Sequence, residues 1–157
     1  HSFPPRRSSD LQKMLQGDIS GTLADFELET VRDYLHRLLK LMQAGKVASA
    51  HDLSEGGLGV ALSETLFKTD LGMDLDLRHL TADQFFSETP GRLVVTVPAE
   101  AAADFESAMG GDATMVGTVT NSHWLQARLA DAEVNQSVAE LQKLWEEALP
   151  CQLKSKD

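Results

Sequence analysis

The chain has 157 residues, of which 42% are hydrophobic and 24% charged. This composition suits one globular domain and excludes wholesale disorder, a collagen-like repeat and a disulfide-stapled miniprotein. Fourteen basic and 24 acidic residues give a net charge of −10, which argues against nucleic acid or an anionic membrane as the main partner, because both require a basic surface. A phosphate ligand is compatible with this charge, since backbone N–H groups and a divalent metal can hold it.

The sequence predicts neither a membrane span nor a secretory signal. It contains no run of about 18 apolar residues, and its first residues lack the apolar middle region of a signal peptide. The single cysteine, Cys151, cannot form an internal disulfide, which fits a reducing compartment. We therefore expect a cytoplasmic location.

The N-terminal residues differ in character from the rest. Ser2–Leu11 resembles the translation of a common sequencing-library adapter, with Pro5 where that translation has threonine. We therefore expect residues 1–11 to be adapter-derived and disordered, and residues 12–28 to be a linker or a truncated element. The alternatives are a natural basic arm or a targeting segment built on the two arginines.

A helix is predicted from about Glu29 to Met42, with Gly45 as its stop, because a glycine commonly follows the last helical turn. Its apolar residues recur at helical spacing: Val31, Tyr34, Leu35, Leu38, Leu39, Leu41 and Met42. A short strand is predicted at Val47–His51. A second helix, with a buried stripe from Leu58 to Leu66, should follow it.

The next segments predict mainly strands. Gly72 opens a strict alternation of apolar and charged residues, which is typical of a half-buried strand. Asp74 and Asp76 fall on its solvated face, so we assign them no chemistry. The β-branched run Arg92–Val97 predicts a central strand. Two further strands, at residues 114–120 and 124–129, are predicted to form a hairpin.

Three more helices complete the prediction. They lie at Thr81–Ser87, at Ala99–Met109 and from Val138 to Pro150, where the proline should end the helix. The alternation of helices and strands predicts an α+β domain, with a mixed sheet of about four strands flanked by helices. This domain should span residues 29–150, with a C-terminal tail at 151–157.

The candidate site is the segment Ser49–Leu58, SAHDLSEGGL, which lies where a strand ends and a helix begins. Ser54 is a natural helix N-cap, and Gly56 and Gly57 would let a ligand reach the backbone N–H groups of the first turn. Phosphate is the expected ligand. If the strand conformation persists, Asp52 points the same way as Ser54 and would hold a magnesium ion beside the phosphates.

A purely structural interpretation of these residues stays open. Aspartate and serine are ordinary residues before a helix, and a glycine pair can serve close packing alone. His51 should face the other way and is more simply a hydrogen-bonded structural residue than a base or ligand. The sequence has no Walker-type glycine loop, no recognisable nucleophile context and no metal-binding histidine spacing.

Four ordered blocks of the sequence resemble one family. They are LQKMLQGDISG (Leu11–Gly21), SAHDLSEGGLGVAL (Ser49–Leu62), FSETPGRLVVTV (Phe86–Val97) and WEEALPCQLKSK (Trp145–Lys156). Together they resemble the C-terminal domain of the aminoimidazole ribonucleotide synthetase-like ATP-binding superfamily. Within it, they are most similar to large synthetase subunits of the separate-subunit bacterial phosphoribosylformylglycinamidine synthase family.

The resemblance implies a ligase of de novo purine biosynthesis that uses ATP and ammonia to convert formylglycinamide ribonucleotide to its amidine. The implied partners are the missing N-terminal domains, a glutaminase subunit and a small accessory subunit. The N-terminal domains would supply the catalytic histidine, so this fragment should be inactive alone and carry no catalytic residue. By the same resemblance, Asp52 is the Mg²⁺ ligand, and Ser54 with Gly56 and Gly57 binds nucleotide.

Two other functions stay open at this point. The chain could belong to a different member of the same superfamily, such as the aminoimidazole, selenophosphate or thiamine-phosphate ATP-using enzymes, although the terminal block argues against these. It could also be a stand-alone binding domain without a catalytic partner. Glu88 and Arg92 might pair across an interdomain contact, although a surface salt bridge or no interaction is the simpler expectation.

Overall fold

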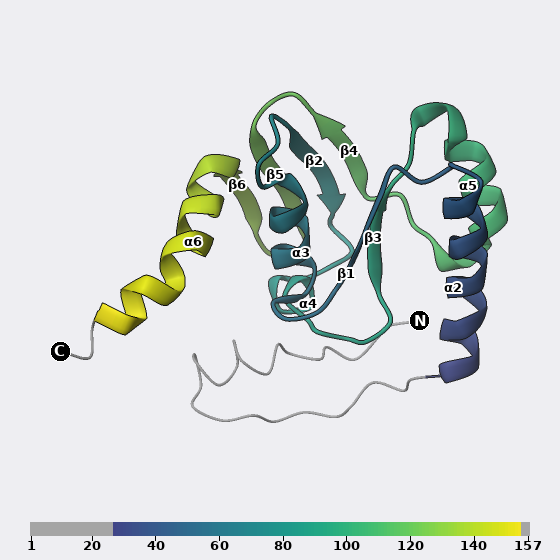
Figure 1. Cartoon of the computed structure of the whole chain (residues 1–157), viewed down its shortest axis with the longest axis horizontal. Coiled ribbons are helices and arrows are strands. Elements are labelled where there is room, and N and C mark those ends of the chain that lie inside the picture. The colour runs from purple at the N-terminus through teal and green to yellow at the C-terminus, as the bar shows by residue number, and fades with distance from the viewer. Residues whose placement is uncertain (1–26, 155–157) are drawn as a thin grey trace. The chain divides into compact units, whose positions relative to one another are not determined.

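The computed structural model describes residues 27–154, and the side chains of residues 27–148 (Figure 1). The expectations for residues 1–11, for most of the linker and for the last residues of the tail fall outside this range. The described chain forms two compact units. Unit 1 comprises residues 27–61 and 83–115, and unit 2 comprises residues 62–82 and 116–154. Within the described range, no helix is long and apolar enough to cross a membrane.

Unit 1 contains a small apolar core between two of its helices. Its elements are α2 (Leu28–Gln43), β1 (Ser49–Asp52), the start of α3 (Gly57–Leu66), most of α4 (Ala82–Phe85), β3 (Leu93–Thr96), the 3₁₀ turn η1 (Ala99–Ala101), α5 (Ala102–Met109) and the 3₁₀ turn η2 (Gly110–Asp112). In Figure 1, α2 and α5 lie side by side. Their core consists of Leu38, Leu41, Phe105 and Met109, with β3 side chains packed against it.

The apolar stripe of α2 is wider than the surface it buries. Leu38 and Leu41 are buried in the core, with Tyr34 packed against it, whereas Leu35 and Leu39 are exposed. The helix ends as predicted. Gly45 adopts a positive φ of 72°, and the backbone N–H of the residue after it bonds to a carbonyl five residues earlier, at 2.9 Å.

β1 and β3 form an antiparallel pair, in which Ser49 faces Thr96 and Asp52 faces Leu93. The prediction of β3 as a central strand is wrong, because β1 is its only neighbour among the described residues. The β-branched residues of β3 are half-buried rather than fully buried. Such residues suit any pleated surface that is partly covered, so their presence did not fix the strand's place in a sheet.

Unit 2 contains the predicted mixed sheet of four strands. These are β2 (Gly72–Leu77), β4 (Gly117–Thr120), β5 (Trp124–Leu129) and β6 (Glu133–Ser137), in the order β4-β2-β5-β6. β2 and β5 are parallel, and the other two pairs are antiparallel. The α+β architecture with a mixed four-stranded sheet is thus confirmed.

The predicted hairpin between residues 114–120 and 124–129 is wrong. β2 lies between β4 and β5, and the hairpin joins β5 to β6 instead. The sequence of β6, EVNQS, is almost entirely polar and gave no strand signal. The last helix, α6, also differs, since it runs from Val138 to Lys154 and does not end at Pro150.

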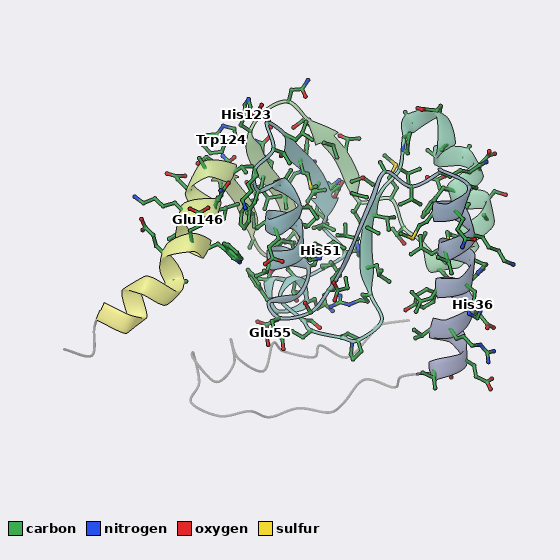
Figure 2. All side chains as sticks on the ribbon, in the orientation of Figure 1. His36, His51, Glu55, His123, Trp124 and Glu146 are labelled. Atoms are coloured by element: carbon green, nitrogen blue, oxygen red, sulfur yellow. The ribbon has the colours of Figure 1, made fainter. Side chains whose placement is uncertain are left out.

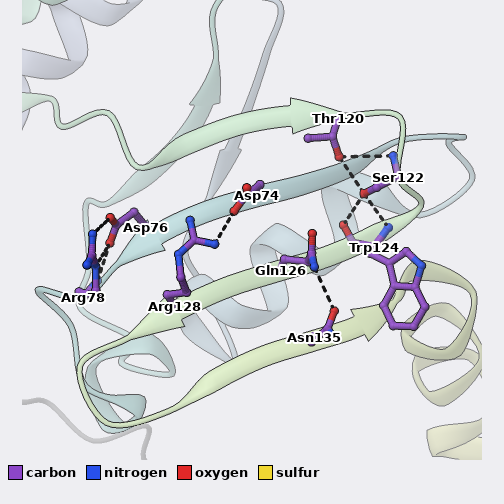
Figure 3. A network of polar contacts seen from close by, with 9 residues as sticks. All are labelled: Asp74, Asp76, Arg78, Thr120, Ser122, Trp124, Gln126, Arg128 and Asn135. Carbon is purple, nitrogen blue, oxygen red and sulfur yellow. Dashed lines mark hydrogen bonds and ion pairs between the residues drawn. The ribbon is translucent and has the colours of Figure 1, made fainter.

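One face of the sheet is polar, as the alternation in β2 predicts (Figure 3). Arg128 contacts Asp74 at 2.8 Å, and Arg78 donates to Asp76 at 2.9 Å. The hydrogen bonds that the side chain and the backbone N–H of Arg78 donate to Asp76, together with the positive charge of Arg78, hold the pKa of Asp76 well below its usual range. The opposite side chains of β2 and β5 are buried, so both aspartates belong to the solvated face.

Replacing Leu77 by alanine should lower the free energy of unfolding of unit 2 by about 2–5 kcal/mol, because this leucine is fully buried and its loss leaves a cavity. Trp124 and Trp145 are the only tryptophans and both lie in unit 2, so urea unfolding followed by tryptophan fluorescence reports on it. Leu144→Ala, at a position 68% exposed, is the control and should change stability by less than about 0.5 kcal/mol. Equal losses in both variants would contradict the placement of the core.

Candidate functional site

Two segments of unit 1 build the candidate site. We call residues 52–57 the glycine turn and residues 86–92 the facing loop. Strand pairing continues one residue beyond β1, because the N–H of Leu53 donates to the carbonyl of Arg92 at 3.0 Å. Leu53 is buried, whereas Asp52 and Ser54 on either side of it are exposed. The expectation that Asp52 and Ser54 share one side therefore agrees with the alternating burial.

The glycine turn closes at Gly57. Its N–H donates to the carbonyl of Ser54 at 3.1 Å, and Gly56, the third residue of this turn, has a positive φ of 77°. Glycine is favoured at such a position because it lacks a Cβ. The helix α3 then begins at Gly57, three residues after Ser54. The prediction that Ser54 is the N-cap is therefore wrong, since the chain makes a separate turn before the helix.

Gly57 lies against the backbone of the facing loop. A Cβ at this position would meet the carbonyl oxygen of Ser87 at 2.6 Å and the carbonyl carbon of Phe86 at 2.7 Å. Gly57 also has a positive φ of 61°. Close packing alone therefore requires a glycine here, and the structural interpretation of this residue holds whether or not a ligand binds.

The N–H groups of both glycines have partners within the chain. The N–H of Gly57 bonds to Ser54 as described, and that of Gly56 donates to Oε1 of Glu88 at 3.1 Å. The carboxylate of Glu88 thus lies where the sequence predicted an anion. Sequence analysis missed this contact because Glu88 is 32 residues away in the chain, and the two segments meet only in the folded structure.

Arg92 makes hydrogen bonds within the facing loop. Its guanidinium donates to the carbonyl of Ser87 and, at 3.5 Å, to that of Thr89. Burial lowers the pKa of this guanidinium. Arg92 therefore links the two ends of the facing loop. The carbonyl oxygen of the buried residue Ser87 accepts a hydrogen bond from Arg92 and also packs against Gly57.

Asp52 and His51 lie at the end of β1, and Figure 2 labels His51 and Glu55 there. Nδ1 of His51 is 2.6 Å from the backbone oxygen of Asp52, which agrees with a hydrogen-bonded role for the histidine. The carboxylate of Asp52 is 76% exposed. Among the described residues, no three His, Cys, Asp or Glu side chains gather to hold a metal. Asp52 could therefore bind Mg²⁺ only together with water and ligand oxygens.

Comparison with protein families shows to which family the chain belongs. Residues 7–129 match the model described as "AIR synthase related protein, C-terminal domain". The chain belongs to this family. The match includes both segments of the candidate site and all strands except β6.

Members of the AIR synthase related family include much longer relatives. The chain is 67% identical over 149 residues to the phosphoribosylformylglycinamidine synthase subunit PurL of Limosilactobacillus fermentum. This alignment covers 95% of the chain and 20% of that relative. It also resembles the structure of T. maritima PurL complexed with ATP, with a TM-score of 0.59, 21% identity, and coverage of 69% of this chain and 21% of that one. The chain thus spans about a fifth of the length of these proteins.

Gly57→Ala should destabilise unit 1 more than Gly45→Ala. Both glycines have positive φ, which costs alanine about 1–2 kcal/mol, but only Gly57 also meets backbone atoms, adding roughly 1–3 kcal/mol for the forced shift. A Cβ at Gly45 would meet nothing within 4 Å. Urea unfolding followed by far-ultraviolet circular dichroism measures the difference, and equal losses would show that the facing loop moves away without cost.

Proposed function

We propose that the chain is the C-terminal domain of the large synthetase subunit of a phosphoribosylformylglycinamidine synthase. The observation that carries this proposal is the 67% identity, over 95% of the chain, to the L. fermentum subunit of that name. Because the chain corresponds to a fifth of that subunit, the remaining domains would supply the catalytic groups. The domain alone would be inactive.

In the proposed reaction, ATP phosphorylates the amide oxygen of formylglycinamide ribonucleotide, and ammonia then displaces phosphate to give the amidine. A glutaminase subunit would release the ammonia from glutamine, and a small accessory subunit would complete the complex. A structure with the same fold, PurLQS from Thermotoga maritima, has a TM-score of 0.60 and 18% identity over 83% of this chain and 24% of that one. The complex would work in the cytoplasm.

The glycine turn is the proposed nucleotide contact of this domain. Asp52 would provide one carboxylate to Mg²⁺, and Ser54, Gly56 and Gly57 would contact the phosphates. Two observations support a requirement for the metal. First, the glycine turn and the facing loop together carry three carboxylates, those of Asp52, Glu55 and Glu88, but only one cation, Arg92. Second, the guanidinium of Arg92 donates to backbone carbonyls. A phosphate would therefore meet net negative charge unless a divalent cation offsets it.

Binding of a phosphate at Gly56 would also displace the carboxylate of Glu88 from its N–H. A helix N-terminus and the amides beside it favour any anion, so the two groups would compete for one donor. Weak nucleotide binding by the isolated chain is the expected consequence.

A chimera tests the proposed function. The matching fifth of the L. fermentum relative is replaced by residues 12–157 of this chain, and ATP-dependent formation of the amidine from formylglycinamide ribonucleotide is measured. The chimera should retain activity within about tenfold, which corresponds to about 1.4 kcal/mol, whereas the 157-residue chain alone should have none. A folded chimera without activity would contradict the proposal.

The same chimera tests Asp52. Asp52→Asn should remove one class of Mg²⁺-dependent nucleotide site in titration calorimetry, with at least about a tenfold loss of affinity, because a neutral amide is a poor ligand for a hard cation. Glu55→Gln, which removes an exposed carboxylate of the same turn, is the matched control and should change affinity by less than about threefold. Unchanged affinity in Asp52→Asn would exclude Asp52 as the metal ligand.

A further inference from the structure

The helix α2 carries a second apolar stripe beside the one that packs on α5. Leu28 is 71% exposed and Leu39 is 49% exposed, and Leu35 lies between them on the same side of the helix. These residues recur at intervals of seven and four, so they align along about three turns. No described residue buries them. An exposed stripe of this length is typical of an interaction surface rather than of a free helix.

A shallow groove runs along this stripe. Its lining residues in the described part of the chain all lie on α2, and they are Leu28, Val31, Arg32, Leu35, His36 and Leu39. Arg32 lies at its edge and donates to Asp33 at 3.0 and 3.1 Å, and His36, labelled in Figure 2, lies on the same helix. A small-molecule site would need several polar groups that converge on a ligand. This groove instead suits a ridge of apolar side chains.

We infer that the α2 groove is the docking site of an amphipathic helix from the part of the longer polypeptide that lies outside this chain. The inference rests on the proposed function, because it requires that longer polypeptide. Ridges of side chains three and four residues apart pack into the groove of a neighbouring helix.

The length of the relatives supports this occupant over a second copy of the chain. The chain covers 20% of the L. fermentum subunit, so about four-fifths of such a polypeptide lies outside it. A segment of the same polypeptide is present at an effective concentration in the millimolar range. It would therefore cover the groove before a second molecule did. The exposed leucines would then be buried in the complete protein.

Cysteine labelling tests whether the groove is covered. Leu39→Cys places a thiol in the groove, and Lys40→Cys, the next residue, places one on the exposed polar side of the same helix. Both variants are made in the 157-residue chain with Cys151→Ser and in the chimera. Alkylation rates are read by mass spectrometry of the peptide that contains α2. In the chimera, labelling of Leu39→Cys should slow at least about tenfold, while that of Lys40→Cys should change less than about twofold.

Three results would overturn the inference. The first is an equal labelling rate of Leu39→Cys in the chain and in the chimera. The second is slow labelling of Leu39→Cys already in the chain at low concentration. The third is labelling of Leu39→Cys that slows as the chain concentration rises, which would indicate a second copy. Labelling does not depend on catalysis, so a folded chimera that is inactive but protected would refute the proposed function alone. An active, unprotected chimera would refute only the groove assignment.

A stability measurement checks the same point without the chimera. Leu39→Glu should leave the urea midpoint of unfolding of the 157-residue chain nearly unchanged, because an exposed side chain contributes little to the core. Leu38→Glu, one position away and buried, should unfold unit 1. A large loss in Leu39→Glu would mean that the chain itself already covers the groove, and would overturn the inference.

Discussion

Contact between two stretches of backbone at Gly57 fixes the geometry of the candidate site. The glycine turn and the facing loop approach so closely there that no side chain fits between them. This approach and the bond from Leu53 to Arg92 hold the two segments in one register. Glu88 can then reach the N–H of Gly56. The contact between Glu88 and Gly56 therefore depends on the absence of one Cβ at Gly57.

The existence of most helices and the solvated face of β2 could be predicted, because the signal for each lies within a few residues. Gly45 ended a helix as expected, and the alternation that begins at Gly72 placed Asp74 and Asp76 on the solvated face. Strand partners depend on distant residues. β6 is polar and β3 is β-branched, yet composition gave the first no strand signal and wrongly made the second central. The order of strands therefore could not be read from local pattern.

In the candidate site too, the features set by neighbouring residues could be predicted, and those that depend on distant residues could not. The sequence located the glycine turn and the shared side of Asp52 and Ser54, since both follow from a strand that meets a helix. It did not predict the separate turn at Ser54 or the carboxylate on Gly56. The first depends on a positive φ at Gly56, which glycine permits but does not require. The second depends on a loop 32 residues away.

The glycine turn and the facing loop carry more negative than positive charge, which bears on how the proposed nucleotide contact would work. Three carboxylates and one arginine lie in the glycine turn and the facing loop, and the arginine serves backbone carbonyls. If this site contacts a nucleotide as proposed, the countercharge for its phosphates would come from a metal ion or from another part of the polypeptide. The exposed apolar groove of α2 belongs to the same unit. Unit 1 therefore has both an unbalanced charge and an uncovered apolar face, and one neighbouring domain that supplies cations and an apolar helix would satisfy the two together.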